Sequence, residues 1–392
     1  MNQPIFLNLV ERLEGFLGKL PASIQKPVLQ ELTPLKELFL KQRSPRFVLT
    51  GSQRFPAQEV IASVFAAAEP GDLRNVLMEV SRWHAVNVGR HGAVAVLDAR
   101  GAESTGMRQI EEELAREPAD MILHLVDGNS GRPVLSKDLE QLGRVARITA
   151  EARTKILGIS LLGTRNARSS ESDRATAQSK LQSALEENAV FADRLLQVFE
   201  LPVPLPHSSE TAPAAETTRL MKLLTAEMPN EARVEMVRIS RDREAQVQIA
   251  HSLVKSTSAI CTAIGAQPIP LADLPILTAL QLMMVSGIMY IAGRERSPRV
   301  AAEFIGALGV NVGAGMVLRE GARAVLKFFP GWGNVVCGMV AGAGTYGLGK
   351  AAIVYFLEGV TIMDARRTYL STRKKAPRPK LLKRAEKADA PR

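Results

Sequence analysis

The sequence predicts an α/β domain with a mostly parallel sheet, followed by an all-α domain. From residue 46 to residue 228, short apolar segments alternate with helical segments, which is the pattern of parallel strands joined by helices. Beyond Gln267-Pro-Ile-Pro270 the composition changes sharply, and long uncharged runs of helical length replace the strands. The 392 residues have room for two ordinary domains of this kind.

Residues 1–45 are predicted to form an amphipathic helical arm ahead of the first domain. Apolar residues recur at helical spacing on both sides of Pro21. The arm is either a docking segment or a pair of helices that packs on the next domain.

The α/β domain is expected at 46–228, with five apolar segments of strand length. These segments are residues 46–51, 92–98, 121–126, 156–162 and 196–201. Helices are expected at 56–65, 108–117 and 217–226, the last after a loop rich in Pro and Ser at 202–216.

The segment from Arg46 to Gln58 has the layout of a phosphate-binding loop. A short strand ends at Gly51, a turn follows, and a helix begins near Pro56, which is the setting of the motif G-x-x-x-x-G-K-[ST]. Pro56 stands in place of the second Gly, Ala57 in place of the Lys, and Gln58 in place of the Ser or Thr. The four residues of the turn are Ser52, Gln53, Arg54 and Phe55.

These three replacements remove the groups that hold a nucleotide in such a loop. Pro56 has no N–H to donate, Ala57 has no ammonium group, and Gln58 has no hydroxyl for Mg²⁺. Each lost contact to a charged group costs about 1.5–3 kcal/mol, or about 4–9 kcal/mol for three. That loss would turn a micromolar site into a millimolar one or worse. The alternative interpretation is a chance strand, turn and helix with one Gly.

Residues 46–228 resemble an Era-like or septin-like small GTPase domain. Asp98-Ala-Arg-Gly101, at the end of a predicted strand, matches the D-x-x-G motif of that family. The resemblance implies that Asp98 holds Mg²⁺ through water if nucleotide binds, and that Gly101 senses the terminal phosphate. The guanine-reading N-K-x-D motif is replaced by Gly163-Thr-Arg-Asn166. The resemblance therefore implies a degenerate Ras-like three-layer GTPase domain.

Residues 229–362 resemble the uncharacterised helical domain of YcjF-type bacterial inner-membrane proteins. The stretches that carry this resemblance are 264–275, 329–333 and 341–350. In that family the helical domain often follows an Era-like GTPase domain, so the order of the two parts agrees. The resemblance implies a location on the cytoplasmic side of a bacterial inner membrane.

Two apolar segments of the helical domain are candidates for membrane contact. Leu274–Gly293 is an uncharged run of 20 residues, which is the length that a bilayer core requires. The second candidate is 332–357, and a soluble helical core is the alternative for both. Two G-x-x-x-G spacings would allow close helix packing, formed by Gly309 with Gly313 and by Gly338 with Gly342.

Residues 363–392 are predicted to form a basic disordered tail. The stretch from Asp364 to Arg392 holds 11 basic and 3 acidic residues, a net charge of +8 out of +10 for the chain. Such a tail attracts anionic lipid by about 1 kcal/mol per basic residue near the surface. No module that reads nucleic acid accompanies the tail, so we expect no specific nucleic-acid partner. A tail that only keeps the protein soluble is the alternative.

Other site chemistry finds little support in the sequence. The two cysteines form no metal-binding pair, none of the five histidines has a partner at metal-ligand spacing, and we identify no secretory signal. We expect no catalytic residue and no cofactor. The sequence thus predicts a pseudo-GTPase that acts as a membrane-associated scaffold or regulatory module for an unidentified protein partner. The alternatives are an active GTPase that binds GTP or GDP with Mg²⁺, a soluble protein-interaction module, and a nucleic-acid-binding protein driven by the tail.

Overall fold

A computed structural model describes most of the chain, in segments. The described residues are 29, 41–65, 81–89, 92–129, 134–163, 171–203, 215–265, 273–309 and 332–375. The chain divides into two compact units, which are Gln42–Asp242 and a second unit of Arg243–Arg392 with Met1–Lys41. We call them the sheet unit and the helical unit. Nearly all of the predicted N-terminal arm lies outside the described residues, as does 376–392 of the predicted tail. The first part of that tail was predicted to be disordered but is helical, because it belongs to the helix Ile362–Lys375, which packs on the rest of the helical unit.

The sheet unit contains one six-stranded sheet with the order β2-β3-β1-β4-β5-β6. The strands are β1 (Arg46–Gly51), β2 (Trp83–Val88), β3 (Gly92–Asp98), β4 (Met121–Asp127), β5 (Lys155–Leu162) and β6 (Leu195–Pro202). Edge strand β2 is antiparallel to β3, and the other neighbouring pairs are parallel. This arrangement confirms the predicted α/β fold with a mostly parallel, Ras-like sheet.

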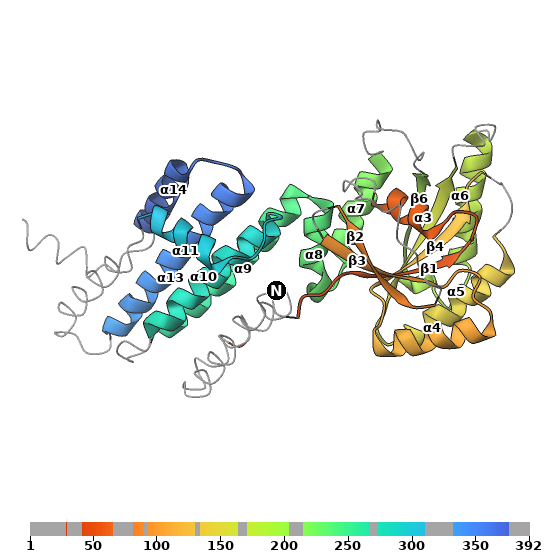
Figure 1. The fold of residues 1–392 in the computed structure, drawn as a ribbon, viewed down its shortest axis with the longest axis horizontal. Coiled ribbons are helices and arrows are strands. Elements are labelled where there is room, and N and C mark those ends of the chain that lie inside the picture. Colours follow the sequence, from red (N-terminus) through yellow and green to blue (C-terminus); the bar gives the residue numbers. More distant parts are fainter. Residues whose placement is uncertain are drawn as a thin grey trace, which may run out of the picture. The chain divides into compact units, whose positions relative to one another are not determined.

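Helices cover both faces of the sheet and complete three layers (Figure 1). One core lies under α3 (Ala57–Val64), α7 (Ala215–Glu227) and α8 (Asn230–Ser240). The other core lies under α4 (Ser104–Arg116), α5 (Ser136–Ile148) and α6 (Glu171–Glu186). A short 3₁₀ helix, Ala192–Arg194, leads into β6. The central strands are therefore buried on both faces, which explains their nearly continuous apolar sequences.

Helix α8 belongs to the sheet unit, so the boundary lies after Asp242 rather than after residue 228. Glu235 of α8 accepts hydrogen bonds from the backbone N–H of Ala93 at 3.3 Å and from Gln42 Nε2 at 2.9 Å. These bonds tie α8 to β3 and to the segment before β1. The helix ends at Arg241, whose φ of +55° is left-handed, so the chain turns before the next helix begins.

The helical unit contains five described α-helices and one π-helical turn. They are α9 (Arg243–Gly265), α10 (Asp273–Ile291), α11 (Pro298–Ala307), α13 (Trp332–Ala352), the π-helix η4 (Ile353–Leu357) and α14 (Ile362–Lys375). Helices α9 and α13 pack antiparallel, since Gly342 lies against Thr262 and Gly349 lies against Val254. Side chains larger than hydrogen at these two glycines would overlap α9.

The four glycines predicted to pack helices have different places in the structure. Gly342 lies at the α9–α13 contact. Gly309 instead follows the end of α11 with a φ of +71°, close to Arg366, so it terminates a helix because glycine tolerates the left-handed region. Gly313 and the surroundings of Gly338 lie outside the described residues.

Among the described residues, one helix is long and apolar enough to cross a membrane by length and composition. It covers Met339–Leu357, which is 19 residues, and 56% of its apolar window is buried inside the unit. A shorter apolar helix covers Ile276–Ile291. Because the long helix is also partly core, its composition alone does not decide between a membrane span and a core helix.

Candidate functional site

The loop after β1 begins at Gly51, whose backbone conformation and surroundings require a glycine. Gly51 has a φ of +90°, and a Cβ there would overlap the carbonyl oxygen of Leu125 on β4. The next residue, Ser52, donates its backbone N–H to the same oxygen at 2.8 Å. Only glycine fits at Gly51, because both the φ and the close approach to β4 exclude a side chain.

The loop ends where Pro56 starts helix α3. Pro56 has φ −54° and ψ 146° and is the N-cap residue of the helix. The sequence predicted Pro56 as the first helical residue, and the first helical residue is instead Ala57. Its carbonyl accepts the first helical hydrogen bond from Val60 at 3.1 Å. Phe55 is buried in the core under α3. Ala57 and Gln58 are the first residues of the helix itself, so α3 brings no ammonium group and no hydroxyl to the loop.

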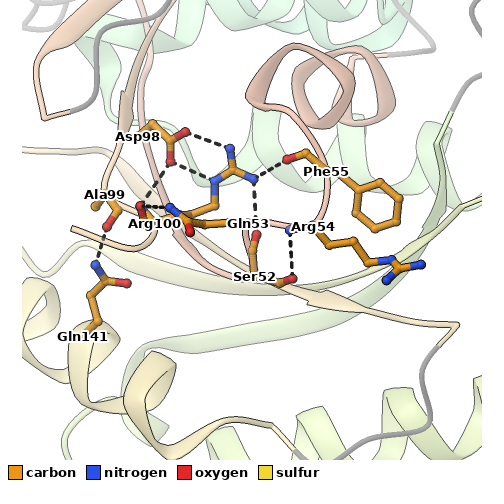
Figure 2. A network of polar contacts seen from close by, with 8 residues as sticks. All are labelled: Ser52, Gln53, Arg54, Phe55, Asp98, Ala99, Arg100 and Gln141. Atoms are coloured by element: carbon orange, nitrogen blue, oxygen red, sulfur yellow. Dashed lines mark hydrogen bonds and ion pairs between the residues drawn. The ribbon is translucent and has the colours of Figure 1, made fainter. Parts of the chain in front are cut away.

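Arg100, inside the D-x-x-G motif, fills the space under the loop (Figure 2). Its guanidinium forms a two-point ion pair with Asp98, with Nε–Oδ1 at 2.8 Å and Nη2–Oδ2 at 2.7 Å. Its Nη1 donates to the carbonyl oxygens of Phe55 at 2.7 Å and Ser52 at 3.2 Å. The Arg100 side chain is only 4% exposed. An internal cation therefore holds the loops after β1 and β3 together.

This contact reverses the polarity that phosphate binding requires. A phosphate-binding nest points several backbone N–H groups at an anion, whereas here two loop carbonyls accept hydrogen bonds from a cation. Both oxygens of Asp98 are also engaged, since Oδ1 accepts a further hydrogen bond from the backbone N–H of Arg100 at 3.2 Å. The carboxylate that the family resemblance assigns to Mg²⁺ is thus bound to Arg100.

Two amide side chains reinforce the connection between the loops. Gln53 donates from Nε2 to the carbonyl oxygen of Arg100 at 2.8 Å, and Gly101, with a φ of +64°, lies directly under the Gln53 amide. Gln141 of α5 donates to the carbonyl oxygen of Ala99 (Figure 2). Gly101 therefore supports the turn and the packing of Gln53.

The loop after β1 has a cation of its own, Arg54, which is also paired with a carboxylate. Arg54 Nε lies 2.9 Å from Asp127 Oδ2 at the end of β4. Asp127 Oδ1 accepts the backbone N–H of Asn129 at 3.1 Å, and Asn129 Nδ2 donates to the carbonyl oxygen of Gly163 at 3.0 Å. This chain of contacts links the loop to the ends of β4 and β5.

A cleft of about 770 Å³ opens beside this network, at the carboxyl ends of β1, β3 and β4. Ligand sites of open parallel sheets commonly occur at this edge. The charged side chains in its lining balance in sign, and they are Arg54, Lys137, Arg144, Asp127, Asp138 and Glu140. Burial raises the pKa of Asp138, while the neighbouring Lys137 opposes this rise. The part of the lining that the structure describes therefore carries no excess positive charge that would favour a triphosphate.

His124 lies on β4 close to Gly51, in the core rather than in the cleft. Its side chain is fully buried, and burial lowers its pKa to about 4. Nδ1 lies 3.1 Å from Thr50 Oγ1, but Nε2 has no hydrogen-bond partner among the described residues.

The structure brings the predicted residues 51–58, Asp98 and Gly101 together at one edge of the sheet. Sequence reasoning missed Arg100, Asn129 and Gln141. The one feature of the sequence that could have indicated Arg100 is its charge, at one of the two unspecified positions of the D-x-x-G motif. No cluster of three or more His, Cys, Asp or Glu suited to a metal occurs among the residues that the structure describes.

Comparison with known proteins gives limited similarity. No family model matches the chain. The chain is 29% identical over 132 residues to Magnetosome membrane protein 22 of Magnetospirillum gryphiswaldense, which covers 31% of this chain and 66% of that protein. The match therefore spans just under two thirds of the relative's length.

Among solved structures, the chain is similar to a dimerization-deficient mutant of Toc33 from Arabidopsis thaliana. The TM-score is 0.34 and the identity 13%, over 56% of this chain and 94% of that one. A likeness at this level supports no functional conclusion. The GTPase-like fold follows from the strand order and the loop geometry described above.

Proposed function

We propose that the sheet unit is a pseudo-GTPase with weak or no nucleotide binding, within a membrane-associated scaffold or regulatory protein. One observation carries this proposal: Arg100 occupies both oxygens of Asp98 and two carbonyl oxygens of the loop. The protein supplies its own cation at the place where a GTPase of this fold would hold Mg²⁺ and phosphate.

Nucleotide binding would require this ion pair to open. Breaking a buried ion pair by removing one partner costs about 3–5 kcal/mol. The three missing loop groups cost about 4–9 kcal/mol in addition. Either amount alone lowers affinity by at least about a hundredfold. Together they place binding of GTP, GDP or ATP beyond the millimolar range.

Three features support the membrane part of the proposal. The helix Met339–Leu357 has the length and composition of a membrane span, and one similar protein carries the name of a membrane protein. The basic C-terminal stretch would attract anionic lipid. With the resemblance to YcjF-type proteins, these features favour contact through 274–293 and 332–357 at the cytoplasmic side of a bacterial inner membrane.

The nucleotide part is tested by isothermal titration of the full chain with GTP, GDP and ATP, with and without Mg²⁺. We expect no binding tighter than about 1 mM. Micromolar, Mg²⁺-dependent binding that Asp98→Ala abolishes would support the rival function, an active GTPase, and that rival also predicts measurable GTP hydrolysis.

The membrane part is tested by cell fractionation followed by a carbonate wash. We expect the chain in the membrane fraction, and release by carbonate would indicate contact with the surface rather than a span. Recovery of all the protein in the soluble fraction would refute membrane association and favour the soluble interaction module.

A further inference from the structure

A groove of about 580 Å³ in the helical unit lies between α9, α13 and α14. Four of its lining residues, Met339, Ala343, Tyr346 and Lys350, follow one face of α13. At a rise of about 1.5 Å per residue, Met339 and Lys350 are about 16 Å apart along the helix. The groove therefore runs from Met339 and Ala343, beside Gly342 and Thr262, to the ammonium group of Lys350.

Lys350 is a half-buried cation in this groove. Its Nζ lies 5.5 Å from the centre of the Tyr346 ring. Within the described part of the chain no carboxylate forms an ion pair with Lys350, and the groove lining contains no Asp or Glu. An ammonium group in a groove whose described lining has no carboxylate is available to pair with an anionic ligand.

The hydroxyl groups of the groove differ in what they can donate. Ser258 donates to Val254 at 2.6 Å, and Thr262 donates to Ser258 at 2.8 Å, in both cases to backbone oxygens of α9. Ser371 similarly donates to the carbonyl oxygen of Thr368 at 3.1 Å. The donors that remain beside one another for an anion are Lys350 and the hydroxyl of Tyr346, which lie one turn apart on α13.

Both signs of charge occur near the groove, with basic groups in excess. The pKa of His251 on α9 is lowered first by burial and then by Lys350 and Lys255, against the opposing effect of Glu358. Helix α14 carries Arg366 and Arg367, and Arg367 pairs with Asp364 at 3.1 Å. The sequence from Asp364 to Arg392 has a net charge of +8 and would attract anionic groups to the chain.

We propose that this groove binds one anionic phospholipid, with the phosphate at Lys350 and Tyr346 and an acyl chain along Met339 and Ala343. The groove lies on Met339–Leu357, the helix with the composition of a membrane span, so its apolar end is continuous with the surface expected to meet lipid. The inference rests on the membrane association proposed above. Free phosphate shares the headgroup chemistry but would leave the apolar end of the groove empty.

The test measures co-sedimentation of the full chain with vesicles of phosphatidylglycerol mixed with phosphatidylcholine, compared with phosphatidylcholine alone. Lys350→Gln should lower the partition coefficient on the anionic vesicles at least about tenfold. The matched control is Lys255→Gln, which removes the same charge from the same unit outside the groove and should cost no more than about fivefold. Lys350→Arg should restore most of the binding, because it keeps the charge.

A second pair of variants tests the apolar end without changing charge. Ala343→Phe fills the groove and should weaken binding, whereas Val340→Phe, at a position 48% exposed and outside the groove lining, should not. Circular dichroism identifies any variant that fails to fold. Inorganic phosphate in excess should not displace the protein from the vesicles.

Each outcome decides a different claim. If the wild-type chain binds no vesicle, the membrane part of the proposed function and the groove both fail. If the wild-type chain binds but Lys350→Gln and Lys255→Gln lower the partition coefficient equally, only the proposal that the groove binds lipid is overturned. If inorganic phosphate displaces the protein and Ala343→Phe binds normally, the ligand is free phosphate and the lipid proposal is wrong.

Discussion

Arg100 Nη1 donates to the carbonyl oxygen of Phe55 across 2.7 Å, so a side chain from the loop after β3 holds the loop after β1. The same guanidinium neutralises Asp98. In a nucleotide-binding domain of this fold these two loops are connected through bound Mg²⁺ and phosphate. Here the side chain of Arg100 makes this connection. The conformation of the loop after β1 is therefore held by the protein itself and not by a bound ligand.

The first prediction concerns the stability that Arg100 supplies. Arg100→Ala should lower the free energy of unfolding of the sheet unit by about 3–5 kcal/mol, because it leaves Asp98, only 13% exposed, without its counter-ion. Trp83 and Trp332 are the chain's two tryptophans. Urea unfolding followed by Trp83 fluorescence in a Trp332→Phe background therefore reports on the sheet unit.

The control for this experiment is Arg108→Ala on α4. Arg108 is 82% exposed and pairs at 3.9 Å with Glu112, which is 58% exposed, so its removal should change stability by less than about 1 kcal/mol. An Arg100→Ala variant as stable as this control would show that the ion pair does not hold the loops.

The second prediction concerns Gly51. Gly51→Ala should destabilise the sheet unit by more than about 2 kcal/mol, because its φ of +90° is unfavourable for L-residues and the Cβ would overlap Leu125. Gly143→Ala, inside α5, has open space around the new methyl group and should stabilise by about 0.5–1 kcal/mol. The same fluorescence assay measures both, and effects of equal sign would contradict the loop geometry.

The third prediction concerns the pH dependence that His124 confers. Burial lowers its pKa from 6.5 to about 4, so between these values the unfolded chain binds a proton that the folded chain excludes. With respect to His124, the free energy of unfolding is therefore highest above pH 6.5. It falls by about 3 kcal/mol in all as the pH drops toward about 4.

The measurement is urea unfolding at a series of pH values between these limits. The double variant His124→Leu with Thr50→Val removes the titrating group and its hydrogen-bond partner together. We expect a flatter stability profile for the variant than for the wild-type chain. Identical slopes in the two profiles would show that His124 is not buried in its neutral form.

The fourth prediction concerns the contact between α9 and α13. Gly349→Ala should lower the thermal stability of the helical unit, because its Cβ would overlap the side chain of Val254. Gly344→Ala, with open space around the new methyl group, should be neutral or stabilising. Thermal melts followed by circular dichroism compare the two, and equal melting temperatures would contradict the antiparallel packing.

The sequence predicted β1, β3, β4, β5 and β6 and missed the edge strand β2. Strands β1 and β4 are continuous apolar runs because helices cover both of their faces. Edge strand β2 buries Val86 and Val88 but exposes Ala85 and Asn87, so its apolar content is too low to stand out. Helix α6 was missed because it contributes only Ala177, Leu181 and Leu185 to the core.

The candidate site was predictable as a turn between a strand ending at Gly51 and a helix starting near Pro56, but the contact made by Arg100 was not. Asp98 and Arg100 are two residues apart, so in an extended chain their side chains would lie on the same face. An extended chain would not, however, bring both guanidinium nitrogens to the two carboxylate oxygens. The turn at Gly101, with its φ of +64°, directs the guanidinium back onto Asp98 and under Phe55. That geometry depends on packing between β1 and β3, which no local pattern encodes.

The most direct test of the central claim is a crystal structure of the full chain grown with Mg²⁺ and a non-hydrolysable GTP analogue in excess. The account predicts Arg100 on Asp98 and on the carbonyl oxygens of Ser52 and Phe55, with no nucleotide against the loop. Density for the analogue seated against Gly51 and Asp98, with Arg100 displaced from the carboxylate, would contradict it.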